Sequence, residues 1–343
     1  MPNQPHQNRR QFLGAAAGTL AVAGTSQVPF APARAQSSAG SGAHTVFGEL
    51  KRINTGVLST SYVDMGPENG YPVILLHGWP YDINSYIDVA PELVRAGYRV
   101  IIPYLRGYGA TKFLSDSTLR NGQPAALALD IIALMDALRI PTALIGGYDW
   151  GGRTADVIAA VWPERCKGLV AVSGYLIGSQ EGSRMPLPPR AELQWWYQFY
   201  FTTERGRAGY DRNRYDFNRL IWQLASPQWT FDEATYARSA AAFDNPDHVA
   251  VVIHNYRWRL ALVDGERQYD ALERQLAAAP VIRVPSISME GDANGAPHPD
   301  PAVYANKFVG KYEHRLVRGG IGHNLPQEAP QAFVRAILDV ARM

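Results

Sequence analysis

The sequence contains little cysteine, little net charge and no hydrophobic run long enough to span a membrane. One cysteine, Cys166, among 343 residues excludes an internal disulfide. Thirty-three Lys and Arg residues against 31 Asp and Glu leave a formal charge of +2, so nothing suggests a nucleic-acid partner. The apolar stretch at residues 14–24 is too short and too rich in Ala and Gly for a stable membrane anchor. The rest of the composition, 46% hydrophobic and 19% charged residues, is typical of a globular protein.

The N-terminus carries the pattern of a targeting segment. Twin arginines at positions 9–10 precede an apolar pair and the Ala/Gly stretch, and residues 33–35 (Ala-Arg-Ala) form a small-x-small cleavage site. This pattern resembles a twin-arginine signal, which exports proteins that are already folded. We expect residues 1–35 to be the signal peptide, residues 36–44 to be a flexible mature N-terminus, and the protein to be periplasmic or secreted.

From residue 45 onward, strand patterns alternate with helix patterns. Residues 124–138 show the 3.6-residue apolar spacing of a helix most clearly. Strands are expected at the short apolar or alternating runs 57–63, 72–76, 98–103, 168–173, 286–290 and 315–317. This alternation predicts an α/β fold, with a mainly parallel sheet and helices on both faces.

The alternation stops between residues 174 and 264. This stretch opens with the Pro-rich segment 185–189 and contains aromatic-rich helical patterns without convincing strands. We therefore expect a helical cap at 174–264, inserted into a core that consists of residues 45–173 and 265–343.

The segment 143–153 reads as a buried strand, a sharp turn and the start of a helix. Gly147 and Gly151 stand two positions either side of Asp149. A tight turn favours glycine there because a Cβ would clash, and the pattern is that of a nucleophile elbow with aspartate in place of serine. A carboxylate attacks saturated carbon and leaves an alkyl ester on the protein. Asp149 is therefore the candidate nucleophile; the alternative is a helix-capping aspartate.

His323 lies in a Gly-rich loop between the last expected strand and the last helix. A loop there can bring its imidazole to Asp149, where it would serve as general base for water. Asp292 is the favoured carboxylate to orient His323, because it follows the strand at 286–290. Glu290 at the strand end and the uncharged Asn294 compete for that position.

Two tryptophans are candidates for the oxyanion site. Trp79 follows a buried strand in the segment 77–80 (His-Gly-Trp-Pro), and Trp150 follows Asp149 directly. Their backbone N–H groups could stabilise the tetrahedral intermediate of ester hydrolysis, while their indoles would line the pocket. The alternative for Trp79 is an aromatic side chain that only packs in the core.

Together these motifs resemble the α/β-hydrolase-fold epoxide hydrolase family, in its aspartate-nucleophile branch. The resemblance covers about residues 45–343. It rests on segments that match in order and spacing: 77–80, 105–109 (Leu-Arg-Gly-Tyr-Gly), 149–152, 322–323 and 327–330 (Gln-Glu-Ala-Pro). Most of these motifs also occur in haloalkane and fluoroacetate dehalogenases, so they indicate the superfamily and leave the substrate open.

The resemblance extends into the cap and implies two ring-opening tyrosines. The segment 197–201 (Tyr-Gln-Phe-Tyr-Phe) and the pair Tyr256-Arg257 match the family's strings, which implies that Tyr197 and Tyr256 assist the epoxide oxygen. Two phenols can polarise that oxygen and then donate a proton to it. Each tyrosine could instead simply pack in the cap. The family resemblance implies a small hydrophobic epoxide as substrate, no metal or cofactor, and no membrane partner; the oligomeric state stays open.

Three other functions compete with this interpretation. A haloalkane dehalogenase would hold halide with the Trp150 indole and a second donor. Trp79 occupies the usual Asn position of that second donor, and Trp195 or Trp196 from the cap could substitute for it. A fluoroacetate dehalogenase would use two arginines, of which Arg153 matches one while Trp150 replaces the other. A ligand-binding homologue without turnover is the third, and an inert Asn294 in the acid position would favour it.

Overall fold

The computed structural model describes residues 46–343. The expected signal peptide (1–35) and flexible segment (36–44) lie outside the described residues, and both stay predictions. Within the described part of the chain, no helix is long and apolar enough to cross a membrane.

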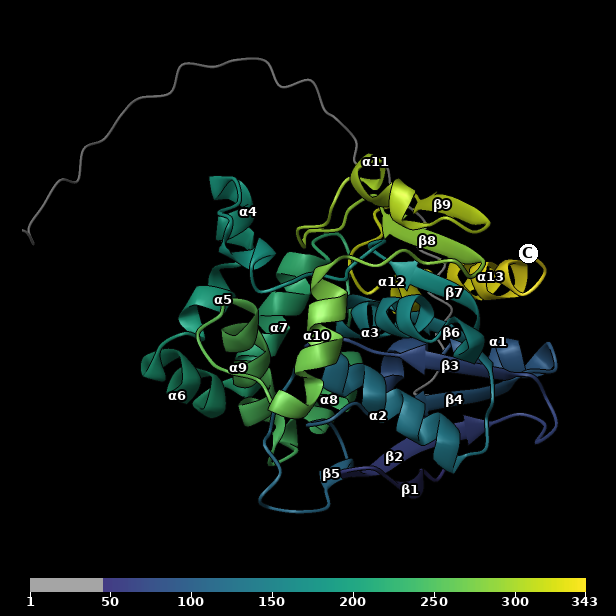
Figure 1. Cartoon of the computed structure of the whole chain (residues 1–343), viewed down its shortest axis with the longest axis horizontal. Helices are drawn as coiled ribbons and strands as arrows, with labels where there is room; N and C mark the ends of the chain where they lie inside the picture. The colour runs from purple at the N-terminus through teal and green to yellow at the C-terminus, as the bar shows by residue number, and fades with distance from the viewer. Residues whose placement is uncertain (1–45) are drawn as a thin grey trace, which may run out of the picture. The chain divides into compact units, whose positions relative to one another are not determined.

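A single nine-stranded sheet forms the centre of the structure (Figure 1). Its order is β1-β2-β4-β3-β6-β7-β8-β9, and β5 pairs with β2. β2 is antiparallel to β1, β4 and β5, and all pairings from β4 across to β9 are parallel. The strands are β1 (Lys51–Thr55), β2 (Leu58–Met65), β3 (Pro72–Leu76), β4 (Arg99–Pro103), β5 (Lys112–Phe113), β6 (Ala143–Gly147), β7 (Cys166–Val172), β8 (Ser286–Gly291) and β9 (Tyr312–Val317).

Helices cover both faces of this sheet. Consecutive residues of a strand point to opposite faces. A Cβ on Gly146 would touch Phe333 and Ile337 of α13 (Pro330–Val340), whereas a Cβ on Gly147 would meet the backbone of α3 (Asp149–Val161). α1 (Val89–Arg95) contacts α13, and α2 (Pro124–Ala137) contacts α3. The central strands β3 and β6 consist of apolar residues that are almost all buried, as expected for a parallel sheet covered on both faces. The predicted α/β-hydrolase fold is confirmed.

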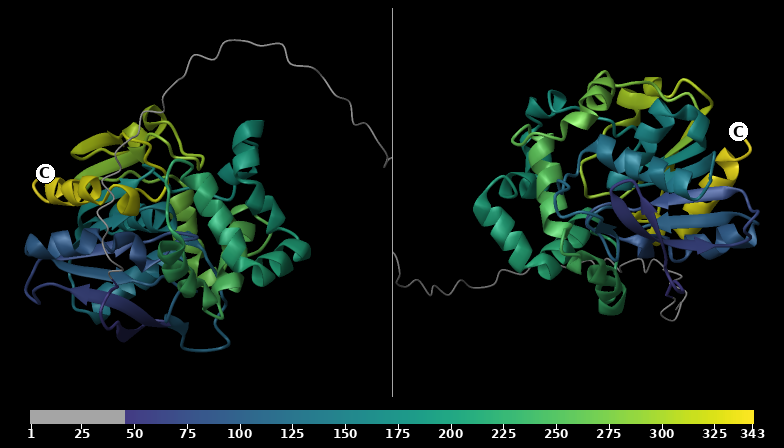
Figure 2. Two further views of the ribbon diagram at one scale, coloured as in Figure 1. Left: turned by 180° about the vertical axis from the view of Figure 1, so that it is seen from behind. Right: turned by 60° about the horizontal axis from the view of Figure 1, so that its bottom comes forward.

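Between β7 and β8, the described chain forms helices and no strand. The α-helices of this stretch are α4 (Pro189–Gln194), α5 (Trp196–Tyr200), α6 (Glu204–Arg212), α7 (Arg214–Ala225), α8 (Glu233–Ala240), α9 (His248–Arg259) and α10 (Asp270–Ala277). Figure 2 shows the helices α5 to α9 gathered at one side of the sheet. α10 instead contacts α2 beside the sheet. Aromatic rings fill the interior of the helical group: Phe201 lies 4.9 Å from Tyr210 and 5.4 Å from Phe217, measured between ring centroids.

The turn between β6 and α3 is packed too tightly for side chains. A Cβ on Gly151 would lie 2.0 Å from the carbonyl oxygen of Leu76, the last residue of β3. Since this neighbour is backbone in the middle of the sheet, it cannot move aside cheaply.

We predict that Gly151→Ala lowers the free energy of unfolding by about 1–3 kcal/mol, the usual cost of overpacking a buried site. Urea denaturation monitored by circular dichroism measures the change. Gly178→Ala is the matched control, because a Cβ on Gly178 would have no neighbour within 4 Å. Equal unfolding midpoints for the two variants would contradict the close packing described here.

Candidate active site

Asp149 occupies the strained turn at the start of α3. Its φ of 52° lies in the left-handed region, which residues with a side chain seldom adopt and which is frequent at functional sites. The flanking glycines make the turn possible: a Cβ on Gly147 would lie 2.4 Å from the carbonyl oxygen of Gly151. A Cβ on Gly78 would lie 2.3 Å from the Cβ of Asp149. The turn therefore presents the carboxylate against the loop that follows β3.

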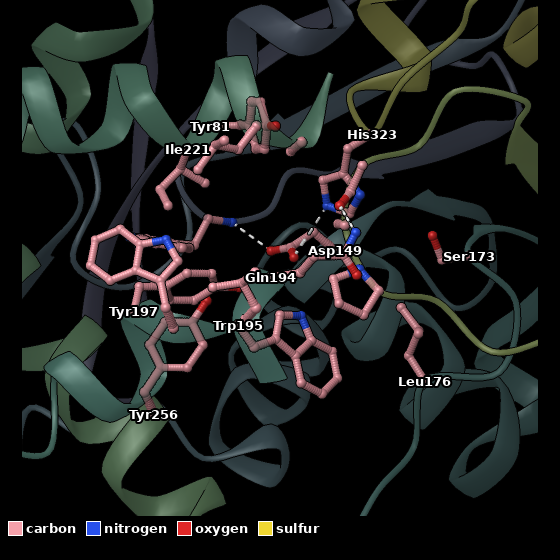
Figure 3. Close-up of a pocket in the computed structure, with 18 of the residues that line it drawn as sticks. Tyr81, Asp149, Ser173, Leu176, Gln194, Trp195, Tyr197, Ile221, Tyr256 and His323 are labelled. Carbon is pink, nitrogen blue, oxygen red and sulfur yellow. Dashed lines mark hydrogen bonds and ion pairs between the residues drawn. The ribbon is translucent and has the colours of Figure 1, made fainter. Parts of the chain in front are cut away.

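The two carboxylate oxygens of Asp149 have different partners (Figure 3). Oδ1 accepts a hydrogen bond of 2.7 Å from the backbone N–H of Trp79, and Oδ2 lies 3.4 Å from Nε2 of His323. Burial raises the pKa of Asp149, but the hydrogen bond and charge of His323 and the backbone N–H groups of Trp79 and Trp150 lower it by more. The net pKa is lower than usual, so the carboxylate is ionised at neutral pH.

His323 is held by its backbone and faces Asp149 with its ring. Its N–H donates to Oγ of Ser226 at 3.0 Å, and Glu328 accepts from both Ser226 Oγ and the N–H of Gly322 at 2.6 Å. Burial lowers the pKa of His323, but the hydrogen bond and charge of Asp149, together with the charges of Glu290 and Glu328, raise it above its usual value. Glu328 belongs to the Gln-Glu-Ala-Pro segment, so the structure explains that motif as a support for the histidine loop.

The expectation that Asp292 orients His323 is corrected by the structure. Asp292 is exposed, and its two oxygens accept hydrogen bonds of 2.9–3.0 Å from the backbone N–H groups of Gly319, Gly320 and Ile321. The carboxylate therefore braces the loop that leads to His323 and does not bind the imidazole. Nδ1 of His323 is buried and has no hydrogen-bond partner among residues 46–343.

Glu290, at the end of β8, contributes a negative charge near His323. Its side chain is buried, and Oε1 accepts a 2.7 Å hydrogen bond from Nδ2 of Asn294. Oδ1 of Asn294 in turn accepts from the N–H of Ala296 at 2.9 Å. The charge of Glu290 is among those that raise the pKa of His323. The sequence signal that could have pointed to Glu290 is a single carboxylate in an otherwise uncharged strand. The structure shows that the whole strand is buried.

Tyr197 from α5 and Tyr256 from α9 meet above the nucleophile. Their ring centroids are 5.3 Å apart, and the ring of Trp79 lies 5.0 Å from Tyr197 and 5.2 Å from Tyr256. Burial and the charge of Asp149 raise the pKa of Tyr197 to about 12, although Arg259 opposes this. Burial and the charges of Tyr197 and Asp149 raise the pKa of Tyr256 well above its usual value, although Arg259 opposes this. Both phenols therefore keep their protons at neutral pH.

One cavity of about 560 Å³ brings most of the predicted site together. Six predicted residues line it: Trp79, Asp149, Trp195, Tyr197, Tyr256 and His323. Trp150 packs behind them with its ring 5.9 Å from that of Tyr256, and Asp292 lies outside the lining. Arg259 also lines the cavity, although no sequence motif points to it. Among the described residues, no group of three or more His, Cys, Asp or Glu side chains could hold a metal ion.

Comparisons with known proteins agree with this site. A family model described as alpha/beta hydrolase fold matches residues 71–210. Epoxide hydrolase B of Mycobacterium tuberculosis is 34% identical over 340 residues, which cover 80% of this chain and 93% of that protein. This chain belongs to the epoxide hydrolase family of the α/β-hydrolase fold, and the predicted resemblance is confirmed.

Two further relatives show the breadth of the family. The crystal structure of a Klebsiella pneumoniae protein, provisionally described as an epoxide hydrolase, is 61% identical with a TM-score of 0.86 and covers 87% of this chain and 98% of that one. A haloalkane dehalogenase of Mycobacterium marinum is 29% identical and covers 76% of this chain and 86% of its own. The expected relation to dehalogenases is therefore confirmed as well.

We predict that Glu290→Gln lowers the pKa of His323, because it removes one of the charges that favour the imidazolium. Asp292→Asn should leave that pKa unchanged and should instead lower the stability of the protein, since a neutral amide holds the three backbone N–H groups less strongly. Titration of the His323 imidazole by NMR and thermal unfolding measure the two effects. A pKa that responds to Asp292→Asn and not to Glu290→Gln would contradict the assignment.

Proposed function

We propose that this protein opens an epoxide to a vicinal diol through an ester formed at Asp149. The observation that carries the proposal is the pair of phenols, Tyr197 and Tyr256, that line the same cavity as an ionised carboxylate. An epoxide needs a nucleophile at carbon and an acid at oxygen at the same time. The cavity provides both, and the family to which the chain belongs supports the same reaction.

In the first half-reaction, an oxygen of Asp149 attacks one epoxide carbon and the carbon–oxygen bond of the ring breaks. The oxygen that leaves the carbon is hydrogen-bonded by Tyr197 and Tyr256, and one of these phenols transfers its proton to it. The product is a hydroxyalkyl ester of Asp149 and a tyrosinate. The aromatic rings of Trp79, Trp195 and Trp196 surround this step in the cavity.

In the second half-reaction, His323 takes a proton from water, and the resulting hydroxide attacks the carbonyl carbon of the ester. The backbone N–H groups of Trp79 and Trp150 already serve the Asp149 carboxyl group in the resting state, and they would stabilise the oxyanion of the tetrahedral intermediate. Collapse of the intermediate frees the diol and restores the carboxylate. The proton on His323 then returns to the tyrosinate.

The charge of Asp149 also controls when His323 can act as a base. In the resting protein this charge raises the pKa of His323. Ester formation removes the charge, so the pKa of His323 falls and the ring becomes neutral when a base is required. The ion pair of the resting state therefore contributes stability at pH values below the unfolded pKa of histidine and loses it as pH rises through the folded pKa.

Haloalkane dehalogenation is the second candidate, and one observation favours it. Nε1 of Trp150 is buried and forms no hydrogen bond of ordinary geometry with a described residue, as a halide donor would require. The indole of Trp79, however, donates to the hydroxyl of Tyr210 at 2.8 Å and is not available for a halide. Trp195, a candidate for the second halide donor, has the guanidinium of Arg259 5.6 Å from its ring centroid. Epoxide opening gives a role to the phenols of Tyr197 and Tyr256, whereas dehalogenation leaves both without one.

We predict that Tyr197→Phe and Tyr256→Phe each slow the conversion of styrene oxide to its diol, and that the double variant loses about 10²–10⁴-fold, the usual contribution of general acid catalysis. Phenylalanine keeps the ring packing, so folding is preserved. Diol formation and bromide release from 1-bromobutane are measured side by side. Tyr200→Phe is the control, because Tyr200 belongs to the same helix and does not line the cavity. Bromide release that survives both substitutions, without diol formation in the native protein, would assign the site to dehalogenation.

A further inference from the structure

Two arginines line the cavity beside the nucleophile. Arg153 stands one helical turn after Asp149 on α3, and its Nε donates to the carbonyl oxygen of Leu176 at 2.9 Å. Arg259 is the last residue of α9, and its guanidinium lies 5.6 Å from the ring centroids of both Trp195 and Tyr256. The hydrogen bond and the ring contacts hold both side chains in the wall of the cavity.

Neither guanidinium has an acidic partner. Within residues 46–343, the ion pairs of the structure include neither Arg153 nor Arg259. Arg106, the fully buried arginine among the described residues, instead binds Asp130 at 2.6 Å and 2.7 Å. Arg153 and Arg259 are partly buried, and burial together with the charge of Arg259 lowers the pKa of Arg153 to about 10. Holding two such cations close together without a partner is costly, and such cost is usually tolerated where a ligand supplies the missing charge.

The carboxyl groups near Arg153 do not supply it. Burial raises the pKa of Asp156 well above its usual range, one of its oxygens accepts from the N–H of Leu176, and within the described residues it forms no ion pair with Arg153. Burial raises the pKa of Glu273 to about 7, and its side chain accepts from the N–H of Ala125. Asp149 is the one carboxylate that lines the cavity, and His323 is its partner. The two guanidinium charges of the lining are therefore left without a counter-charge, which an anionic ligand would supply.

We propose that the substrate of this site carries a carboxylate close to its epoxide ring, and that Arg153 and Arg259 bind this carboxylate. The inference rests on the proposed function and names its substrate class. Guanidinium groups bind carboxylates through charge-assisted hydrogen bonds, and the remaining wall of Leu176, Trp195 and Ile221 accepts an apolar body. The substrate carboxylate also replaces the negative charge that the cavity loses when Asp149 becomes an ester.

Arg259 could also serve the tyrosines alone. Its charge opposes the rise in the pKa of Tyr197 and Tyr256, which makes both phenols better proton donors. In that case the loss of Arg259 would slow charged and uncharged epoxides by the same factor. A binding role slows only the charged one, so the ratio of the two rates separates the roles.

The test compares 3-phenyloxirane-2-carboxylate with its primary amide, which has nearly the same shape and no charge. The native protein should prefer the acid by about tenfold or more in kcat/KM, mostly through KM, the scale of one charge-assisted hydrogen bond. Arg153→Gln and Arg259→Gln should each reduce this preference by about tenfold, and Arg259→Lys should restore part of it. Arg212→Gln, an exposed arginine of α6, is the control for a change in net charge and should keep the preference. A native preference for the amide, or arginine variants that slow both substrates equally, would overturn the proposal.

A binding measurement separates this inference from the proposed reaction. Calorimetric titration with 3-phenylpropanoate and 3-phenylpropanamide requires no turnover. The propanoate should bind more tightly, and the difference should grow in Asp149→Asn, because this variant removes the charge that repels it. Tight propanoate binding without any diol formation would refute the reaction and keep the anion site. Diol formation from styrene oxide with equal binding of the two ligands would refute the anion site and keep the reaction.

Discussion

The close contact between the elbow at Asp149 and the loop after β3 is the constraint on which the rest of the site depends. Gly78 and Gly151 let the two backbones approach within a distance that no side chain would allow. That approach brings the N–H of Trp79 to 2.7 Å from the carboxylate. The same contact therefore sets the position of the nucleophile, adds to the effect of His323 in keeping it ionised, and places a donor where the oxyanion would form. The cost is a strained φ at Asp149, which the packed sheet on either side can maintain.

The charged groups around this contact shift one another's pKa values. Asp149 and His323 face each other, and Glu290 and Glu328 add negative charge behind the imidazole. On the opposite side Arg259 lies near the phenols and limits the rise in their pKa. Because most of these groups are buried, water screens them little, and the conversion of Asp149 to an ester would change the proton affinity of its neighbours.

Short-range patterns could be predicted from the sequence, and long-range pairings could not. The glycine spacing around Asp149 and the alternation of strands and helices are local signals, so the elbow and the fold class were predicted correctly. Strand β1 was missed because its residues are mostly exposed and carry no apolar pattern. The acid was misassigned because the partners of Asp292 are backbone groups 27–29 residues away, and no local pattern reveals them. Arg259 was missed because its role depends on how α9 lies over the cavity.

The central claim is that Asp149 becomes an ester that His323 then hydrolyses. The most direct test is mass spectrometry of His323→Gln after incubation with styrene oxide. Without the base, the second half-reaction slows, and the account predicts that the peptide containing Asp149 gains the mass of one substrate molecule. Asp149→Asn under the same conditions should gain none. An unmodified Asp149 peptide in His323→Gln, while the native protein forms diol, would contradict the ester and would indicate direct attack of water on the epoxide.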